Sequence, residues 1–330
     1  MLNSLLTRSN PQVTLILSRA LAAARPAILA FLITQGDRLG GESKVPVSFC
    51  NVLFVGNLCS AIAVCLFFDF RTIVRDLQSL ENKILWGLFV NGCLAAVLSS
   101  LIFLGLKETS VTNAVLIGRF GPVLYAVIGS FILGNKLGKL ELFGFALIVV
   151  GIGVITLKES NFQLNQGDAL ILLSTLAYTC TALIGRIALS GKCSLEVVVF
   201  TRNFISSVFF FIIAMSLFGF SHFMDIFSGQ LWIVMSVYGL FVVVLAQLMW
   251  YSALKRLDSK TVGSLTALSP IFSIFYAFVL NGELPTQVQL SALAVIFVGL
   301  LISNLGKKRS PKSESELAKM PTMESTASGS

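Results

Sequence analysis

The chain contains ten apolar segments, each about as long as a membrane-spanning helix. A helix rises 1.5 Å per residue, so about 20 apolar residues cross the roughly 30 Å hydrocarbon core of a bilayer. The segments lie approximately at 13–35, 46–68, 84–106, 110–134, 139–157, 168–190, 194–219, 230–254, 260–281 and 287–305. This pattern predicts an all-α integral membrane protein with ten transmembrane helices.

The composition excludes a soluble globular domain. Of the 330 residues, 55% are hydrophobic and 12% are charged, whereas soluble domains carry about 25% charged residues. A net charge of +8 would suggest nucleic acid as a partner of a soluble protein. Here most of that charge falls in loops, and we expect no nucleic-acid partner. The six cysteines form no CxxC or Cys/His pattern and His222 is the only histidine, so we expect no disulfide framework, no metal site and no cofactor.

The positive charges predict the orientation of the chain. With ten spans, the loops alternate sides and both termini share one side. Fifteen Lys and Arg residues fall on that shared side: Arg8, Arg71, Arg75, Lys83, Lys136, Lys139, Lys192, Lys255, Arg256, Lys260, Lys307, Lys308, Arg309, Lys312 and Lys319. Four fall on the other side: Arg38, Lys44, Lys107 and Lys158. Because Lys and Arg accumulate in cytoplasmic loops, both termini are expected in the cytoplasm.

Three arginines lie well inside apolar segments, and no Asp or Glu lies near the middle of those segments. Arg25 is about twelve residues into its segment, Arg119 about nine and Arg202 about eight, which at 1.5 Å per residue is a depth of about 12–18 Å. A charge at this depth costs about 2.5–3.5 kcal/mol and usually marks a function. Cations without a neighbouring acid favour an anionic ligand over a proton or a cationic drug.

Two of the three arginines also have a structural interpretation. Arg202 could bond the carbonyl groups of a helix end. Arg25 precedes Pro26 and could face carbonyl groups that this proline leaves without a partner, or its span could start later. Arg119, two residues before Gly121-Pro122, is the strongest candidate for binding substrate.

Several polar side chains fall at similar depth. Asn91, Tyr178 and Gln247 could hydrogen-bond a substrate, although polar groups also hold membrane helices together. Gly144 and Gly151, seven residues apart, are expected to let two helices approach closely. Arg19 lies only about six residues into the first segment, so its head group can reach the membrane surface.

A weak internal repeat divides the chain into two halves. An offset of 148 residues pairs Pro122 with Pro270 and Gly151 with Gly299. Five spans is an odd number, so the halves, 13–157 and 168–305, must be inverted relative to each other. Residues 1–12 are then a cytoplasmic N-terminus, and the Ser/Glu/Thr-rich residues 306–330 are a disordered cytoplasmic tail.

Inverted repeats are typical of secondary transporters, which bind substrate near mid-depth where helices are broken. A proline removes one helix hydrogen bond. Gly121-Pro122 and Ser269-Pro270 are therefore expected to kink spans four and nine, either for gating or for packing alone.

At these residues the chain resembles the drug/metabolite transporter superfamily, in particular its EamA-type branch with ten helices. The second half carries the family pattern from Ser269-Pro270 through Gly282-Glu283 to Gly299, and Arg202 matches an arginine of the seventh span. The first half departs from it, with Gly134-Asn135-Lys136 in place of Gly-Glu and no arginine at Phe49-Cys50-Asn51. The resemblance implies transport by alternating access, not a particular substrate.

Together these observations predict a secondary transporter of a small polar or anionic metabolite. An amino-acid or drug exporter of the same fold, or a membrane scaffold or receptor without transport activity, are the alternatives. An enzyme is not expected, because the spans offer no histidine and no acid near mid-depth. The expected partners are a small metabolite and the lipid bilayer. The sequence leaves open whether the chain forms a homodimer. A bacterial inner membrane fits better than the membrane of a eukaryotic organelle.

Overall fold

The computed structural model describes residues 10–39, 49–133, 137–158, 165–190, 193–219, 229–254, 256–257, 265–266 and 268–306. Every regular element among them is a helix. The helices of the first half are α2 (Pro11–Ala23), α3 (Arg25–Leu39), α4 (Phe49–Phe67), α5 (Phe70–Gln78), α6 (Asn82–Glu108), α7 (Val111–Ile117), α8 (Phe120–Leu133) and α9 (Lys139–Lys158). Those of the second half are α10 (Gln166–Ser190), α11 (Leu195–Phe218), α12 (Gly229–Val237), the π-helix η2 (Tyr238–Leu245), α13 (Ala246–Leu254), α15 (Ser269–Asn281) and α16 (Gln287–Gly306).

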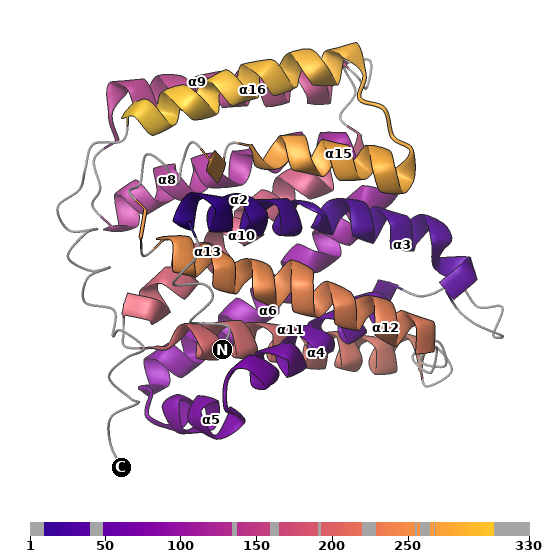
Figure 1. Cartoon of the computed structure of the whole chain (residues 1–330), viewed down its shortest axis with the longest axis vertical. Helices are drawn as coiled ribbons and strands as arrows, with labels where there is room; N and C mark the ends of the chain where they lie inside the picture. Colours follow the sequence, from indigo (N-terminus) through magenta and orange to yellow (C-terminus); the bar gives the residue numbers. More distant parts are fainter. Residues whose placement is uncertain are drawn as a thin grey trace.

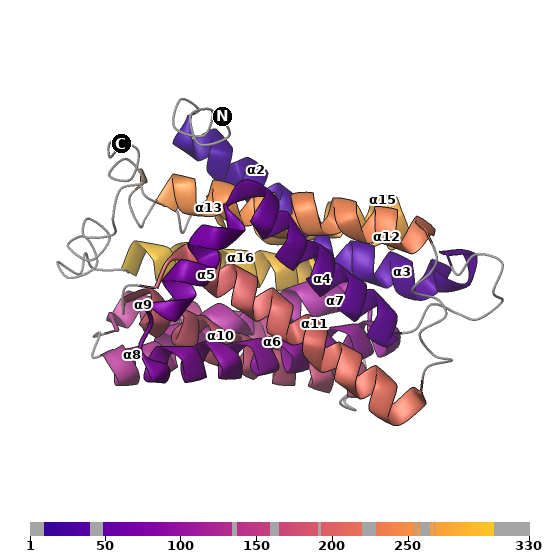
Figure 2. The same ribbon diagram turned by 90° about the horizontal axis from the view of Figure 1, so that it is seen from below.

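The long helices run side by side across the molecule, with the connections at its two ends (Figure 1). Helix α2 begins at the same end of the bundle at which α16 finishes (Figures 1 and 2). We call this the terminal end, and the other the far end. The predicted tail, 306–330, falls outside the described residues except for Gly306, as does most of the predicted N-terminal segment 1–12.

The apolar segments are helices, as predicted. Among the described residues, eight helices are long and apolar enough to cross a membrane. A ninth is reached if α4 and α5, bent by 100° at Phe68-Asp69, count as one span. The ninth predicted span, 260–281, appears as the shorter apolar helix α15, and part of its predicted range lies outside the described residues. The described residues thus support a multi-pass membrane protein, with eight or nine spans in the described part of the chain.

Two of the spans are interrupted near their middle. The first is broken at Ala24, between α2 and α3, immediately before Arg25-Pro26. The fourth is broken at Gly118 and Arg119, between α7 and α8. Sequence reasoning expected a kink at Gly121-Pro122, and the break lies three residues earlier. Pro122 has no N–H group, so the helix loses the hydrogen bond to the carbonyl group of Gly118, four residues earlier, and the break lies there.

Glycines allow a close helix contact between α9 and α16, at the top of Figure 1. A Cβ atom on Gly144 would lie 2.5 Å from the carbonyl oxygen of Gly299, and one on Gly151 would lie 2.6 Å from the side chain of Ile296. The prediction that Gly144 and Gly151 permit close approach of helices is confirmed.

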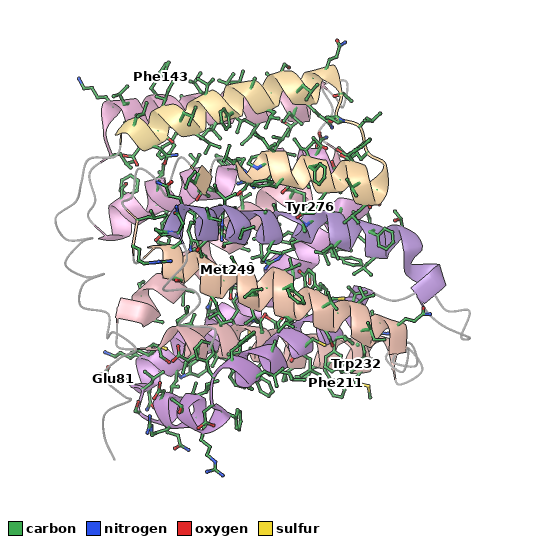
Figure 3. All side chains as sticks on the ribbon, viewed as in Figure 1. Glu81, Phe143, Phe211, Trp232, Met249 and Tyr276 are labelled. Atoms are coloured by element: carbon green, nitrogen blue, oxygen red, sulfur yellow. The ribbon has the colours of Figure 1, made fainter. Side chains whose placement is uncertain are left out.

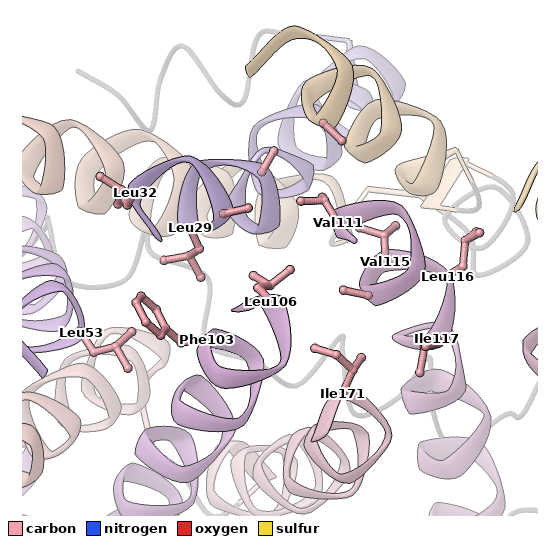
Figure 4. Packing of buried hydrophobic residues seen from close by; sticks show 14 of the residues in the cluster. Leu29, Leu32, Leu53, Phe103, Leu106, Val111, Val115, Leu116, Ile117 and Ile171 are labelled. Atoms are coloured by element: carbon pink, nitrogen blue, oxygen red, sulfur yellow. The ribbon is translucent and has the colours of Figure 1, made fainter. Parts of the chain in front are cut away.

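The side chains separate a buried interior from an apolar exterior. The main cluster of buried residues brings together α3, α4, α6, α7 and α10, for example Leu29, Leu53, Phe103, Leu116 and Ile171 (Figure 4). By contrast, Phe143 on α9 is 56% exposed and lies at the upper edge of the molecule in Figure 3. A large exposed apolar surface is what a helix bundle presents to lipid.

Trp86 and Trp250 lie near helix ends, which agrees with the preference of indole for the membrane surface. Trp86 is 67% exposed. Trp250 stacks under the guanidinium of Arg19, 3.8 Å from the ring centre. Arg19 therefore joins α2 to α13 by a cation–π contact in addition to any contact with lipid.

Candidate functional site

The break between α7 and α8 follows from the local sequence. Pro122 has no N–H group, so the carbonyl of Gly118 cannot receive the usual bond from a residue four positions later. It instead accepts from the N–H of Gly121, at 3.2 Å, while the N–H of Arg119 donates to Leu116 at 3.1 Å. These tighter turns place Arg119 between two helices.

The Arg119 side chain is partly buried at this break. Its Nε donates to the carbonyl oxygen of Val115, at 3.3 Å, and this is the one hydrogen bond of its guanidinium within the described part of the chain. Tyr178 on α10 lies near the guanidinium. A guanidinium has five N–H donors, so the group retains most of its capacity for a ligand.

Helix α10 is fitted closely to this break. The Tyr178 ring packs on Gly121, where an added Cβ atom would lie 3.0 Å from it. The Thr179 hydroxyl donates to the carbonyl oxygen of Gly121, at 3.3 Å. Two of the predicted site residues, Arg119 and Tyr178, are therefore brought together with the predicted kink residue Gly121. Pro122 itself is exposed.

Arg25 and Arg202 form a second group around a residue that sequence reasoning missed. The positive charges of both arginines act on the hydroxyl group of Tyr238, the first residue of η2. Arg25 begins α3, directly after the break at Ala24, and its buried Nε has no hydrogen-bond partner among the described residues. Tyr238 could have been noticed in the sequence, because it is a polar residue about eight residues into the predicted span 230–254. In the structure it begins a π-helix, a feature frequent at functional sites.

The remaining predicted residues lie elsewhere. Asn91 on α6 is 2% exposed, and its Oδ1 atom has no partner among the described residues. Its neighbour Gly92 packs against Ile205 and accepts a bond from Ser206, so this part of α6 faces α11. Gln247 lies beside Leu195 and Glu196, the first residues of α11. Arg202 is two turns further along α11, so Gln247 is closer to the helix ends than predicted.

Ser269 and Pro270 begin α15 and are buried. Proline fits in a first helical turn, where its missing N–H group costs nothing. Two side chains of α15 bond to backbone on either side of the break at Ala24. The Ser273 hydroxyl donates to the carbonyl of Ala23, at 2.9 Å, and Asn281 Nδ2 to the carbonyl of Ala27, at 3.1 Å.

A polar cavity of about 520 Å³ lies at the far end of the bundle, away from the arginines. It is lined by Lys107, Glu108, Thr109, Ser110, Asn113, Asn165, Asp168, Glu283, Leu284, Thr286 and Gln289. Asp168 is 1% exposed and accepts a bond from the Thr109 hydroxyl. The sequence did not predict a site here, because these residues lie at segment ends, where polar side chains are common.

A family model and several curated proteins match the chain. The model, described as the EamA-like transporter family, matches residues 43–157 and 165–305. An uncharacterized transporter of Synechocystis sp. is 30% identical over 302 residues, which is 88% of this chain and 85% of the relative. The riboflavin transporter ImpX of Fusobacterium nucleatum is 21% identical, over 76% of this chain and 86% of the relative.

A protein of known crystal structure shares the fold. The superposition has a TM-score of 0.54 at 19% sequence identity and covers 89% of this chain and 99% of the other. The likeness therefore extends over nearly all of the helical bundle.

Proposed function

The chain belongs to the EamA-like transporter family, and we propose that it moves a small polar or anionic metabolite across the membrane by alternating access. The proposed binding site lies near mid-depth, between two inverted halves of five helices each. The observation that carries the proposal is Arg119, a partly buried guanidinium at a helix break with one hydrogen bond to protein among the described residues. Arginine binds carboxylate and phosphate groups through paired, charge-assisted hydrogen bonds.

The helix contacts support the inverted halves. If span n corresponds to span n + 5, the contact of α6 with α10 corresponds to that of α13 with α2. The contacts of α7 with α15, and of α9 with α16, each join a span to its own counterpart. The family model also matches the chain twice, once in each half. Alternating access in such transporters is largely a rocking of one repeat against the other around a fixed site.

The chemistry of the site favours an anion. A carrier that exports lipophilic cations in exchange for protons needs an acid that binds proton and drug in turn. No acid lies near Arg119 in the sequence, and the described residues around it supply a phenol and backbone carbonyls. We therefore propose a facilitator or exchanger. The riboflavin transporter among the relatives supports an organic metabolite as the kind of cargo.

Anions that bind at this site should raise the thermal stability of the purified protein. A ligand present at 100 times its Kd stabilises the folded state by about 2.7 kcal/mol. The measurement is a thermal-shift screen of detergent-purified protein against carboxylates, phosphates, neutral metabolites and organic cations. Stabilisation by several anions, lost in Arg119→Ala, is the expected result. Stabilisation confined to cations would contradict the proposal.

Both termini are proposed to face the cytoplasm. The shared terminal end of α2 and α16 supports a common side (Figure 1), and the excess of Lys and Arg on that side supports the cytoplasm. A reporter that is active only in the cytoplasm, fused after Ser330, should be active, and an exported reporter at the same place should not. The reverse pattern would refute this orientation.

A further inference from the structure

The turn between α15 and α16 reaches across to the other half of the molecule. Gly282 adopts a left-handed conformation, with φ at 66°, which glycine favours and which ends α15. The next residue, Glu283, accepts hydrogen bonds at the start of α7. Its Oε2 atom accepts from the N–H of Val111 at 2.8 Å, and its Oε1 atom from the N–H of Thr112 at 2.7 Å.

These two bonds complete the capping of α7. The first N–H groups of a helix have no partner within it and must be bonded from outside. The third such group, on Asn113, is bonded by Ser110 Oγ at 3.1 Å, from its own half. All seven residues of α7 are buried, so the N–H groups of Val111 and Thr112 depend on Glu283 of the other half. A carboxylate at a helix N-terminus is also favoured by the helix dipole.

A second contact reinforces the first. Gln289 on α16 donates from Nε2 to Asn113 Oδ1 at 2.7 Å and to Ser110 Oγ at 3.2 Å. Gln289 is 4% exposed. Glu283 and Gln289 therefore join the two halves at the far end of the bundle, in addition to the Thr109–Asp168 bond at this end, and both bond to the start of α7. We call these contacts the far-end latch.

Helix α7 connects the latch to the candidate site. Val111 begins the helix, and Arg119 follows its last turn, eight residues later. At 1.5 Å per residue this is about 12 Å. The Arg119 guanidinium also bonds back to Val115 of α7. One short, buried helix thus connects the first turn of α7 to Arg119.

We propose that Glu283 is a positioning residue whose carboxylate holds the far end of the bundle closed, and that the latch must open whenever the site communicates with that side. This inference rests on the proposed alternating access between halves. A hydrogen-bonded contact suits the role, because water replaces the carboxylate at the N–H groups when the halves separate. If the contact were apolar, water could not replace the interactions that are lost when the halves separate.

The test measures the separation of the halves directly. Spin labels are placed at Lys107→Cys and Gln287→Cys, two exposed positions on opposite halves at the far end, with the native cysteines replaced by serine. Double electron–electron resonance then gives the distance distribution without any substrate. In Glu283→Gln, the ratio of the longer to the shorter distance should rise about tenfold, because hydrogen bonds to a charged acceptor are lost. Fraying of the cap alone would not move the labels apart.

Glu108→Gln is the matched control. Glu108 is an exposed acid that lines the polar cavity at the far end, and its side chain takes no part in the latch. The distance distribution of the spin labels in this variant should therefore equal that of the parent protein. If Glu283→Gln does not fold, Gln289→Ala removes the second latch contact and should shift the distribution in the same direction by a smaller factor. An unchanged distribution in every folded latch variant would overturn the proposal. Because no substrate is used, this outcome is independent of whether the protein carries anions.

Discussion

Replacement of Arg119 by alanine is expected to abolish transport, while the protein still inserts in the membrane and remains monodisperse. The variant loses the group proposed to make two charge-assisted hydrogen bonds to the substrate. Each such bond contributes about 1.5–3 kcal/mol, and 1.36 kcal/mol corresponds to a factor of ten. The initial rate of anion exchange in proteoliposomes should therefore fall by about 100-fold or more.

Two further variants serve as controls for Arg119→Ala. Arg119→Lys keeps the positive charge without the planar fork, and should retain a rate between those of the parent protein and Arg119→Ala. Arg256→Ala removes an exposed arginine just beyond α13 and should leave the rate unchanged. Normal exchange by Arg119→Ala would show that the anion does not bind at the α7–α8 break.

Replacement of Gly144 by leucine is expected to prevent stable packing of α9 on α16. A Cβ atom at Gly144 would lie 2.5 Å from both the carbonyl oxygen of Gly299 and the backbone nitrogen of Ser303. Backbone atoms of a packed helix cannot move aside as a flexible side chain does. We expect a loss of about 3 kcal/mol or more of folding free energy, measured as a lower melting temperature and a smaller monodisperse fraction.

Gly153→Leu on the same helix is the matched control. An added Cβ atom at Gly153 meets nothing within 4 Å. This variant carries the same change in helix propensity and apolar volume without the steric contact, so its melting temperature should stay close to that of the parent protein. Equal destabilisation by both leucines would mean that the close approach of α9 and α16 is not what makes Gly144 necessary.

The positions of the helices could be predicted well because lipid leaves few alternatives. A segment that crosses the hydrocarbon core must satisfy its backbone hydrogen bonds internally, so length and hydropathy suffice. Thus the predicted span 139–157 became Lys139–Lys158, and 84–106 became Asn82–Glu108. The predicted span 260–281 agrees less closely with the structure, because it contains only the short helix α15 and partly falls outside the described residues.

The breaks were predicted less well. Pro122 correctly indicated that the fourth span is interrupted. The two helices of that span are separated by Gly118 and Arg119, however, and not by Gly121-Pro122. The break in the first span at Ala24 was not predicted, although Pro26 implies a missing bond nearby. A proline indicates which carbonyl loses its partner, whereas the surrounding packing decides where the helix path changes.

The sequence could not group the candidate site residues, because depth along a span does not specify which way a residue faces. Tyr178 lies at the α7–α8 break beside Arg119, whereas Arg25 and Arg202 lie near Tyr238. Glu283 was visible in the sequence as part of Gly282-Glu283, but its partner is the start of α7, about 170 residues away. Pairing across such a distance depends on how the halves dock, and no local pattern in the sequence encodes it.

The most direct test of the account is a cryo-EM or crystal structure with the most stabilising anion bound. The account predicts density for its carboxylate or phosphate group against the guanidinium of Arg119, between α7, α8 and α10. Density for that anion only in the polar cavity at the far end, beside Lys107 and Asp168, would contradict it.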